Sequence, residues 1–183
     1  MKTLILLCVS FFLWGHPTTQ PSKRATADGG YVLFLNTPCS STNGRGCDMI
    51  LEKYSKTEVL EWAKTYGGNS WDYIADVLVS PTGYYVLGNT SSFGQGNLDV
   101  YLIKTDSEGE ELWAKTYGGF FNEYGRKLST SRHLENSVII EGERQICPTE
   151  NVSDQCSYIP FIFRVNAMGE GATDCFPEAF VNS

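Results

Sequence analysis

The chain has 183 residues, of which 42% are hydrophobic, 13% aromatic and 19% charged. This composition excludes a disordered chain and a coiled coil, and the length is sufficient for one domain with a hydrophobic core. The formal net charge of −7 argues against general binding to nucleic acid, which needs a basic surface. With two histidines and no Cys-x-x-Cys pair, most zinc sites are also excluded, so we expect no metal and no cofactor.

The N-terminal segment has the pattern of a secretory signal peptide. Lys2 is followed by residues 4–14, which are apolar apart from Ser10. A membrane-spanning helix needs about 20 apolar residues, so this run fits the hydrophobic region of a signal better than a span. The alternative is a buried N-terminal helix. We assign residues 1–20 to the signal, with cleavage between 15 and 27. No later stretch is long and apolar enough to span a membrane, so the sequence predicts a secreted, extracellular protein.

The rest of the chain contains an internal repeat of about fifty residues. Residues 62–68 and 113–119 both read Trp-Ala-Lys-Thr-Tyr-Gly-Gly, and residues 30–33 match 84–87 at an offset of about 54. We place a partial repeat 1 at 28–68, a complete repeat 2 at 69–119, a degenerate repeat 3 at 120–171 and a C-terminal tail at 172–183. Repeat 1 is expected to lack the first strand of the unit.

Each repeat is predicted to form short antiparallel strands joined by turns. In repeat 2, residues 99–105 alternate between two faces and are rich in β-branched and aromatic residues, which is typical of a strand. A turn at 106–109 leads to a second strand at 111–117, which two glycines end. Two earlier strands, at 74–79 and 84–89, complete the unit. Because no helix can be placed after residue 28, we expect an all-β chain.

The clearest copy, Gly83 to Gly119, contains the run G-N-T-S-S-F-G-Q-G-N-L-D-V-Y-L-I-K-T-D-S-E-G followed by L-W-A-K-T-Y-G-G. It resembles the β-propeller repeats of bacterial and archaeal secreted and cell-surface proteins, and the resemblance covers about residues 28 to 171. The resemblance implies that each repeat forms a four-stranded blade that packs on the next one. It brings no catalytic residues, because none define this repeat class.

The number of repeats leaves the closure of the fold open. Propellers typically have four to eight blades, whereas this chain has one complete repeat and two incomplete ones. Such a chain would leave blade faces and strand edges uncovered. The alternatives are an open propeller, a ring completed by association into a homo-oligomer, a β-trefoil or β-prism, and another β arrangement.

Four cysteines flank the same loop in repeats 1 and 3. Cys39 and Cys47 enclose this loop in repeat 1, and Cys147 and Cys156 enclose it in repeat 3. We therefore predict the disulfides Cys39–Cys47 and Cys147–Cys156, which form in an oxidising compartment. Once the signal has been removed, Cys175 is left over, which indicates an intermolecular bond or a different pairing.

The same loop position carries two glycosylation sequons, at residues 89–91 and 151–153. If the source is eukaryotic, Asn89 and Asn151 are candidate glycosylation sites. Together with the cysteine pairs, these sequons indicate that one edge of the molecule is exposed and variable.

No catalytic constellation stands out in the sequence. His133 lies in a polar turn-like stretch and gives little support to a Ser-His-acid triad. The sequence contains no G-x-S-x-G, phosphate-loop or H-E-x-x-H motif. A carboxylate pair for glycoside hydrolysis stays open, since no two acidic residues are singled out. Asp48 and Asp99 recur at equivalent positions, as do Lys53 and Lys104, and this recurrence favours a structural role. We therefore predict a protein without catalytic residues.

Aromatic residues fall into two groups. Trp62 and Trp113 repeat, so we expect them in the core rather than in a sugar-stacking surface. Five others follow the glycine pairs and repeat only partly, and they are our candidates for an exposed aromatic binding surface: Trp71, Tyr73, Phe120, Phe121 and Tyr124. The sequence thus predicts a secreted, non-enzymatic protein that binds a glycan or an extracellular protein. The alternatives are a fragment of a glycan-active enzyme and a truncated remnant of a larger surface protein.

Overall fold

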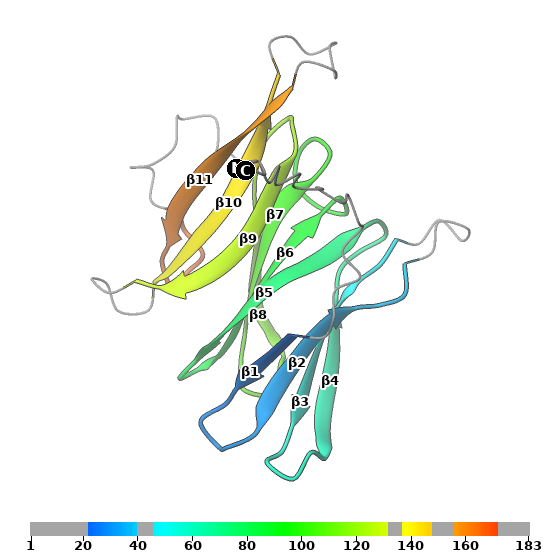
Figure 1. Ribbon diagram of the computed structural model, residues 1–183, viewed down its shortest axis with the longest axis vertical. Coiled ribbons are helices and arrows are strands. Elements are labelled where there is room, and N and C mark those ends of the chain that lie inside the picture. The colour runs from blue at the N-terminus through cyan, green and yellow to red at the C-terminus, as the bar shows by residue number, and fades with distance from the viewer. Residues whose placement is uncertain (1–21, 40–45, 132–136, 148–155, 172–183) are drawn as a thin grey trace, which may run out of the picture.

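The computed structural model describes residues 22–39, 46–131, 137–147 and 156–171 (Figure 1). Every regular element within these residues is a β-strand. The strands form three antiparallel sheets of four, four and three strands, and none of the sheets closes into a barrel. The all-β prediction is therefore confirmed. Across the described residues, no helix is present that could cross a membrane.

Each sheet is a meander in which neighbours along the chain pair with one another. Sheet 1 contains β1 (Ser22–Ala25), β2 (Tyr31–Asn36), β3 (Met49–Tyr54) and β4 (Leu60–Tyr66). Sheet 2 contains β5 (Asp72–Ser80), β6 (Gly83–Thr90), β7 (Asp99–Thr105) and β8 (Glu111–Tyr117). Sheet 3 contains β9 (Glu123–Thr130), β10 (Val138–Ile146) and β11 (Ser157–Val165).

Sheet 1 has a first strand, so the expectation that repeat 1 lacks this strand is wrong. β1 pairs with β2 from Ser22 opposite Phe34 to Ala25 opposite Tyr31. Arg24 of β1 also donates a hydrogen bond of 2.6 Å to Asp76 of β5 in the next sheet. The four residues of β1 are all exposed, so no alternation of apolar and polar residues marked this strand in the sequence.

The strand register also corrects the alignment of β2 with β6. Val32 lies opposite Lys53, and Tyr85 lies opposite Lys104. Since Lys53 and Lys104 are equivalent, β2 and β6 are offset by 53 residues rather than about 54. Side chains alternate along a strand, so a shift of one residue in the alignment changes the face of the sheet on which each side chain is placed. Val32 is thus equivalent to Tyr85.

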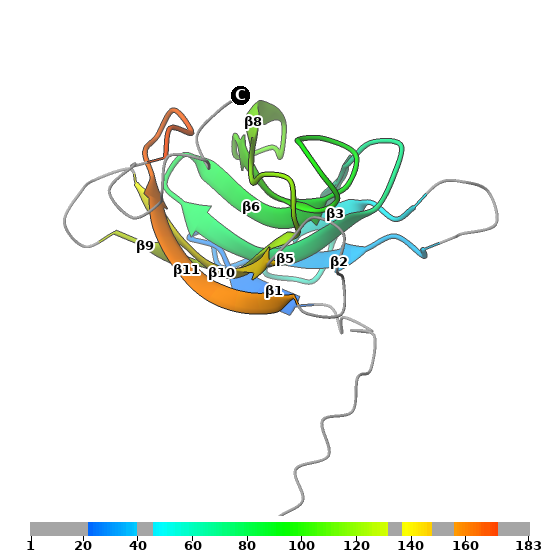
Figure 2. The ribbon, with the colours of Figure 1, turned by 90° about the horizontal axis from the view of Figure 1, so that it is seen from above.

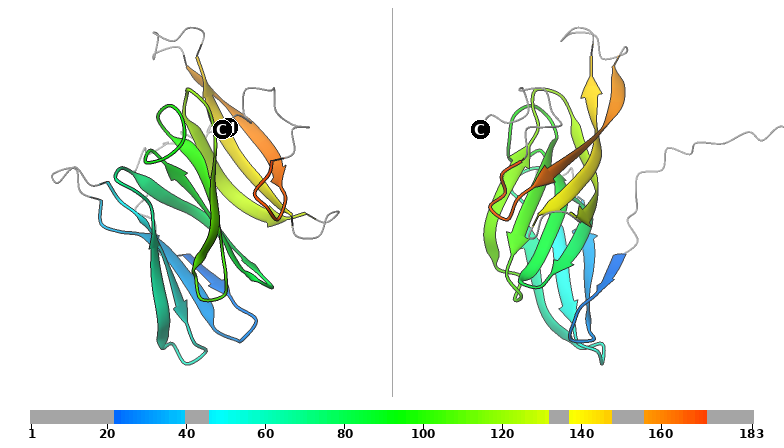
Figure 3. Two further views of the ribbon diagram at one scale, coloured as in Figure 1. Left: turned by 180° about the vertical axis from the view of Figure 1, so that it is seen from behind. Right: turned by 90° about the vertical axis from the view of Figure 1, so that its left-hand side faces the viewer.

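Sheet 2 is the central layer of a stack of three sheets (Figures 2 and 3). β6 and β7 are buried along their whole length because both of their faces are covered. The two faces of β6 contribute to different hydrophobic cores. Tyr84 packs in the core shared with sheet 1, and its neighbour Tyr85 packs in the core shared with sheet 3. Val32, Met49, Leu51, Val86 and Ile103 are fully buried in the first core, and Leu87, Val100, Leu102, Ile140 and Val165 in the second.

Sheets 1 and 2 meet in a contact that we call the first junction, formed by Trp62, Tyr66 and Gly109. The turn before β8 packs under the Trp62 ring, where a Cβ on Gly109 would lie 2.8 Å from ring atom Cζ3. The Tyr66 hydroxyl donates a hydrogen bond of 2.7 Å to the carbonyl of Gly109. Trp62 also contacts Tyr84 edge to face, with ring centroids 5.7 Å apart.

The second junction, between sheets 2 and 3, repeats this contact with Trp113, Tyr117 and Gly169. A Cβ on Gly169 would lie 3.1 Å from the Trp113 ring, and the Tyr117 hydroxyl donates a 2.7 Å hydrogen bond to the Gly169 carbonyl. In addition, the Trp113 indole N–H donates to the carbonyl of Ala167 at 3.0 Å. Both tryptophans therefore pack on the cores, as the sequence predicted.

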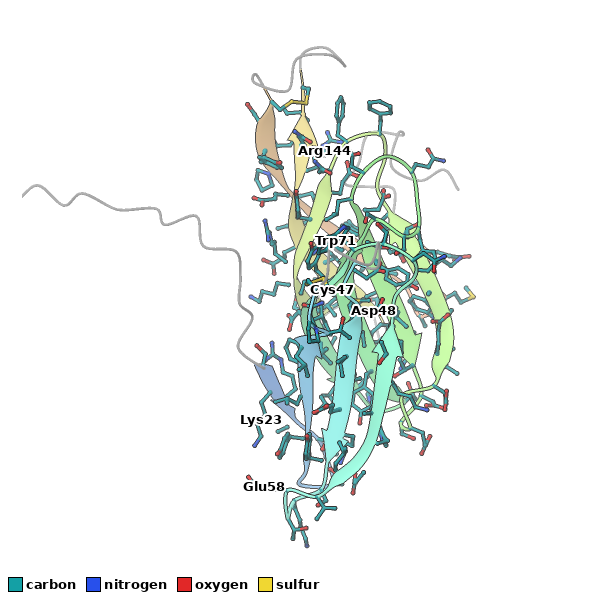
Figure 4. The ribbon with its side chains drawn as sticks, turned by 90° about the vertical axis from the view of Figure 1, so that its right-hand side faces the viewer. Lys23, Cys47, Asp48, Glu58, Trp71 and Arg144 are labelled. Carbon is teal, nitrogen blue, oxygen red and sulfur yellow. A yellow bond between two sulfur atoms is a disulfide. The ribbon has the colours of Figure 1, made fainter. Side chains whose placement is uncertain are left out.

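Both predicted disulfides are present, joining Cys39 to Cys47 and Cys147 to Cys156. Each closes the loop between the second and third strands of its repeat, in sheets 1 and 3. Figure 4 shows Cys47 and Asp48 near Trp71, where the chain passes from sheet 1 to sheet 2. Cys8 and Cys175 lie outside the described residues.

Candidate binding groove

Sheets 1 and 2 enclose a groove between their fourth strands. β5, the first strand of sheet 2, packs against β1, β2 and β3. Along β8 and at the end of β4, the two sheets leave a space of about 450 Å³, which lies within the range of small-molecule sites. Its lining consists of Thr65, Tyr66, Gly67, Phe93, Tyr101, Glu111, Ala114, Lys115 and Thr116.

The groove has an aromatic floor and an aromatic rim. Tyr66 and Tyr101 are buried and form the floor, whereas Phe93 comes from the loop between β6 and β7 and is 43% exposed. The rings of Phe93 and Tyr101 are 5.3 Å apart. Because Tyr66 is fixed by its hydrogen bond to Gly109, the floor is already formed before any ligand binds.

Polar groups come from β8. Thr116 lies opposite Tyr101 in the ladder, and Glu111 lies opposite Thr105, so both side chains are on the face of sheet 2 that looks toward sheet 1. Lys115 is on the alternate face, and a Cβ on Gly169 would lie 2.8 Å from its Cγ. The groove therefore receives a carboxylate and a hydroxyl from β8, and the Lys115 side chain turns away from it.

The electrostatics of the floor agree with this placement. The pKa of Tyr101 is raised to about 12, mainly by burial and in smaller part by the negative charges of Glu111 and Asp72. Burial also raises the pKa of Tyr66, with contributions from the acidic residues of the β7–β8 turn and Glu111. Both phenols are thus neutral at physiological pH, and Glu111 supplies negative charge close to them.

This arrangement suits binding of a ligand that has both apolar and hydroxylated surfaces. A half-exposed aromatic ring can stack on the apolar face of a sugar ring, while a carboxylate accepts hydrogen bonds from its hydroxyl groups and Thr116 donates or accepts. Glycoside hydrolysis uses two carboxylates that flank the bond. Among the described lining residues Glu111 is the single carboxylate.

The five aromatic residues singled out in the sequence lie outside the groove lining. They take part in three ring pairs: Trp71 with Tyr73 at 6.1 Å, Phe120 with Phe121 at 5.4 Å, and Tyr124 with Tyr158 at 5.8 Å. Phe120 is 64% exposed. As a second ligand-binding surface, these residues stay a prediction.

Sequence reasoning missed Phe93 and Glu111. Phe93 stands alone in a polar, glycine-rich loop, and an aromatic residue in such a loop is a signal that could have been followed. Glu111 carried no such signal, because the register of β8 against β7 decides which face it occupies.

Asn89 is not available as a glycosylation site. Its side chain is 6% exposed, and its amide exchanges two hydrogen bonds with the backbone of Gly125 in sheet 3, at 2.7 and 3.2 Å. A glycan on this nitrogen would have to occupy the core between sheets 2 and 3, so this prediction is wrong for the folded chain. Asn151 and His133 lie outside the described residues.

The recurring lysines have structural roles. The Lys53 ammonium on β3 binds Asp28 at 2.7 Å and Glu61 at 2.9 Å, which joins the β1–β2 turn, β3 and β4 within sheet 1. The Lys104 ammonium donates to the carbonyl groups of Thr82 and Thr105. Both lysines therefore stabilise turns at the same end of their sheets.

The recurring aspartates lie beside the glycines that link the sheets. A Cβ on Gly67 would lie 2.3 Å from Asp48 Oδ1 and 2.9 Å from Asp72 Oδ2. A Cβ on Gly118 would lie 1.9 Å from Asp99 Oδ1 and 2.6 Å from Glu123 Oε2, so these two oxygens are at most about 4.5 Å apart. Each link between sheets thus carries a pair of acidic side chains.

The second of these pairs is strongly perturbed. Asp99 and Glu123 are both 2% exposed. The pKa of Asp99 is raised to about 6 by burial, although a backbone hydrogen bond from Gln95 acts to lower this pKa. The pKa of Glu123 is raised to about 7. Burial is the main cause and the charge of the nearby Asp99 adds to it, while a backbone hydrogen bond from Gly119 and the charge of Arg144 act in the opposite direction.

No protein-family model matches the sequence, and a comparison with curated proteins finds no match.

Proposed function

We propose that this protein is a secreted, propeller-like repeat module that binds a neutral glycan in the groove between β4 and β8. The observation that carries the proposal is the half-exposed Phe93, whose ring lies 5.3 Å from that of buried Tyr101 beside Glu111 and Thr116.

The propeller-like part of the proposal is supported by the way successive sheets stack. The first and second junctions use equivalent residues, and a groove opens between the fourth strands of sheets 1 and 2. Such a wedge between consecutive four-stranded sheets is what radial blades require. Secretion is supported by the two disulfides, which persist in oxidising compartments, and by the hydrophobic run after Lys2.

The charge of the molecule narrows the ligand class. A net charge of −7 and a carboxylate in the groove repel sulfated or phosphorylated sugars. Neutral or N-acetylated sugars offer hydroxyl and amide N–H donors to Glu111 and apolar C–H faces to Phe93. A groove of about 450 Å³ has room for a short oligosaccharide rather than a long polymer.

The direct test is a panel of neutral and sulfated oligosaccharides, followed by titration calorimetry on the secreted full chain. We expect binding to neutral members, with Phe93→Ala weakening the affinity about tenfold because the stacking surface is lost. Thr116→Val should weaken it less, because one hydrogen-bonding group is removed.

Phe120→Ala is the matched control, since Phe120 is also an exposed phenylalanine in a loop after a strand but does not line the groove. It should leave the affinity unchanged. If Phe120→Ala loses binding while Phe93→Ala retains it, the ligand binds at the aromatic surface singled out in the sequence and not in the groove. Failure to bind any glycan would contradict the proposed ligand and leave an extracellular protein as the partner class.

A further inference from the structure

The loop between β6 and β7 carries Phe93 and is attached to both links between sheets. At its start, the N–H of Trp71 donates to the Ser91 hydroxyl at 3.0 Å, and the N–H of Ser91 donates to the Trp71 carbonyl at 2.8 Å. Toward its end, a Cβ on Gly96 would lie 2.5 Å from the carbonyl oxygen of Phe120, in the link between β8 and β9. The loop therefore reaches from one link to the other.

Asp99 binds the part of this loop that follows Phe93. The N–H of Gln95 donates a hydrogen bond to the Asp99 carboxylate. A Cβ on Gly94 would lie 2.3 Å from Asp99 Oδ2, so the loop backbone passes directly over this side chain. Phe93 thus lies between two attachments, one at Ser91 and one at Asp99.

The other oxygen of Asp99 lies beside Glu123. A Cβ on Gly118 would be close to both Asp99 Oδ1 and Glu123 Oε2, which are at most about 4.5 Å apart. Glu123 Oε2 accepts a hydrogen bond of 2.9 Å from the N–H of Gly119, in the link between β8 and β9. The loop and the link are therefore both attached to one pair of carboxyl groups.

Two negative charges on this pair would repel each other strongly. Both side chains are 2% exposed, so water screens them little. One negative charge is accommodated, since the N–H groups of Gln95 and Gly119 donate to the pair. The cation that acts on the pair is Arg144, which lies opposite Glu123 on β10. Because burial raises the pKa of Asp99 to about 6 and that of Glu123 to about 7, the second charge forms near neutral pH.

The loop is the part of this arrangement that can move. Residues 93–97 are exposed, whereas β7 is buried along its whole length. Asp99 and Glu123 themselves lie in strands that pair with β6, β8 and β10. Repulsion between the two carboxylates is therefore relieved by movement of the loop rather than of the strands. Since the Phe93 ring lies 5.3 Å from that of Tyr101, such movement takes it away from the groove.

From this geometry we propose that Asp99 and Glu123 form a pH-sensitive switch that holds the Phe93 loop in place. While the pair keeps at least one proton, the loop stays attached and the groove has its aromatic rim. When both carboxyl groups are ionised, the loop leaves Asp99 and ligand binding in the groove weakens. This inference adds regulation to the proposed glycan site and rests on it. Asp99 and Glu123 are positioning residues, because neither lines the groove.

The first measurement needs no ligand. In NMR spectra of the secreted full chain, the amide resonances of Gln95 and Gly119 should shift as the pH is raised from about 5.5 to about 8. The through-space contact between the rings of Phe93 and Tyr101 should weaken over the same range. Glu123→Gln should keep this ring contact at both pH values, because the pair can then carry only one charge.

The second measurement is titration calorimetry with a neutral oligosaccharide that binds in the groove. Between the same two pH values the affinity should fall about five- to tenfold, and by no more than Phe93→Ala loses. Glu123→Gln should bind equally at both pH values, and Phe93→Ala should show no dependence on pH, because the pair acts through this ring. Glu108→Gln removes the same charge from an exposed turn and should keep the pH dependence of the wild type.

Three results would overturn the proposal. The ring contact persists at the higher pH in the wild type, Glu123→Gln keeps the wild-type pH dependence, or the affinity is the same at both pH values although the amide resonances shift. If no neutral oligosaccharide binds, the proposed function fails. The ring contact between Phe93 and Tyr101 then decides by itself whether the pair controls the loop.

Discussion

The first and second junctions place equivalent residues in equivalent positions but treat their acidic side chains differently. In the first, Oδ2 of Asp72 accepts two hydrogen bonds, from the N–H of Gly68 at 2.8 Å and the hydroxyl of Ser92 at 2.6 Å. In the second, Oε2 of Glu123 accepts one, from the N–H of Gly119 at 2.9 Å. The longer side chain of Glu123 thus reaches the same link with fewer donors around it.

Both junctions have the same packing contact between sheets. Each junction has a tryptophan over a glycine with a positive φ, 77° at Gly109 and 79° at Gly169, and a tyrosine hydroxyl on the glycine carbonyl. The stack therefore depends on this contact, because the contact is retained where the sequence of the third repeat has otherwise diverged.

The largest expected effect comes from removing the tryptophans. Trp62→Ala and Trp113→Ala should each lower the free energy of unfolding by about 3 kcal/mol, since each leaves a cavity beside a core. Trp113→Ala should cost more, because it also loses the hydrogen bond to Ala167. Urea denaturation measures both.

Hydrogen exchange distinguishes the two variants further. Trp113→Ala should speed exchange in β10 and β11 and leave β2 and β3 protected, and Trp62→Ala should do the reverse. Equal loss of protection across all three sheets in both variants would show that the stack unfolds as one unit and that the junctions are not separable.

Substitution of the glycines tests the same contacts from the other side. Gly109→Ala should lower the free energy of unfolding by about 2 kcal/mol, because the left-handed backbone disfavours a side chain and the new Cβ meets the Trp62 ring. Gly169→Ala should cost slightly less, since its ring neighbour is farther away, at 3.1 Å rather than 2.8 Å. Thermal denaturation of both variants, with Gly119→Ala as a control in open space, checks the order. A larger cost at Gly169 would contradict the geometric argument.

Much of this organisation could be predicted from the sequence because the repeat is nearly exact where the packing is strict. The run from Trp62 to Gly68 recurs from Trp113 to Gly119, and these residues form the junctions. The disulfides were predictable for a similar reason, since each cysteine pair flanks the same loop of its repeat.

The rest depends on spatial relations that a repeat does not encode. β1 was missed because its four residues are exposed and show no alternation of apolar and polar side chains. The glycosylation site predicted at Asn89 was wrong because a sequon says nothing about burial of the asparagine. The groove is lined by residues of β4 from sheet 1 and of β8 from sheet 2, so it is a property of the stack and not of any one repeat.

A smaller effect should come from the acidic pair of the second junction. Since the pKa of Glu123 is raised to about 7 and that of Asp99 to about 6, the fold favours their uncharged forms. Their contribution to stability is fully present below the unfolded values near 4 and is lost as the pH rises through about 6 and about 7.

Glu123→Gln removes one of the two titrations. The variant should be more stable than the wild type by about 1 kcal/mol at pH 8 and should show a flatter dependence of stability on pH between 5 and 8. Urea denaturation at several pH values measures this, with Glu108→Gln at an exposed turn controlling for net charge. A pH dependence identical to that of the wild type would show that Glu123 does not titrate in this range.

The smallest effect concerns the turn in sheet 1, which no tryptophan of the described residues covers. Glu58 occupies the position equivalent to Gly109 and Gly169, with the same hydrogen bond to the first residue of the turn, and it adopts a φ of 63° (Figure 4). Gly109 and Gly169 must be glycine because a ring lies over each of them, whereas Glu58 is exposed and its side chain meets solvent. Glu58→Gly should therefore raise the free energy of unfolding by about 0.5–1 kcal/mol, since it only relieves the left-handed backbone.

The same residue bears on whether copies of the chain could close a ring through this contact. A ring built by repeating the junctions would pack the last repeat of another copy over position 58, where the Glu58 side chain would stand in its way. If the contact does not form between copies, Glu58→Gly should stabilise the chain and leave its mass in light scattering unchanged. A gain in stability that grows with protein concentration, together with a larger mass, would instead show that residue 58 alone prevents the association.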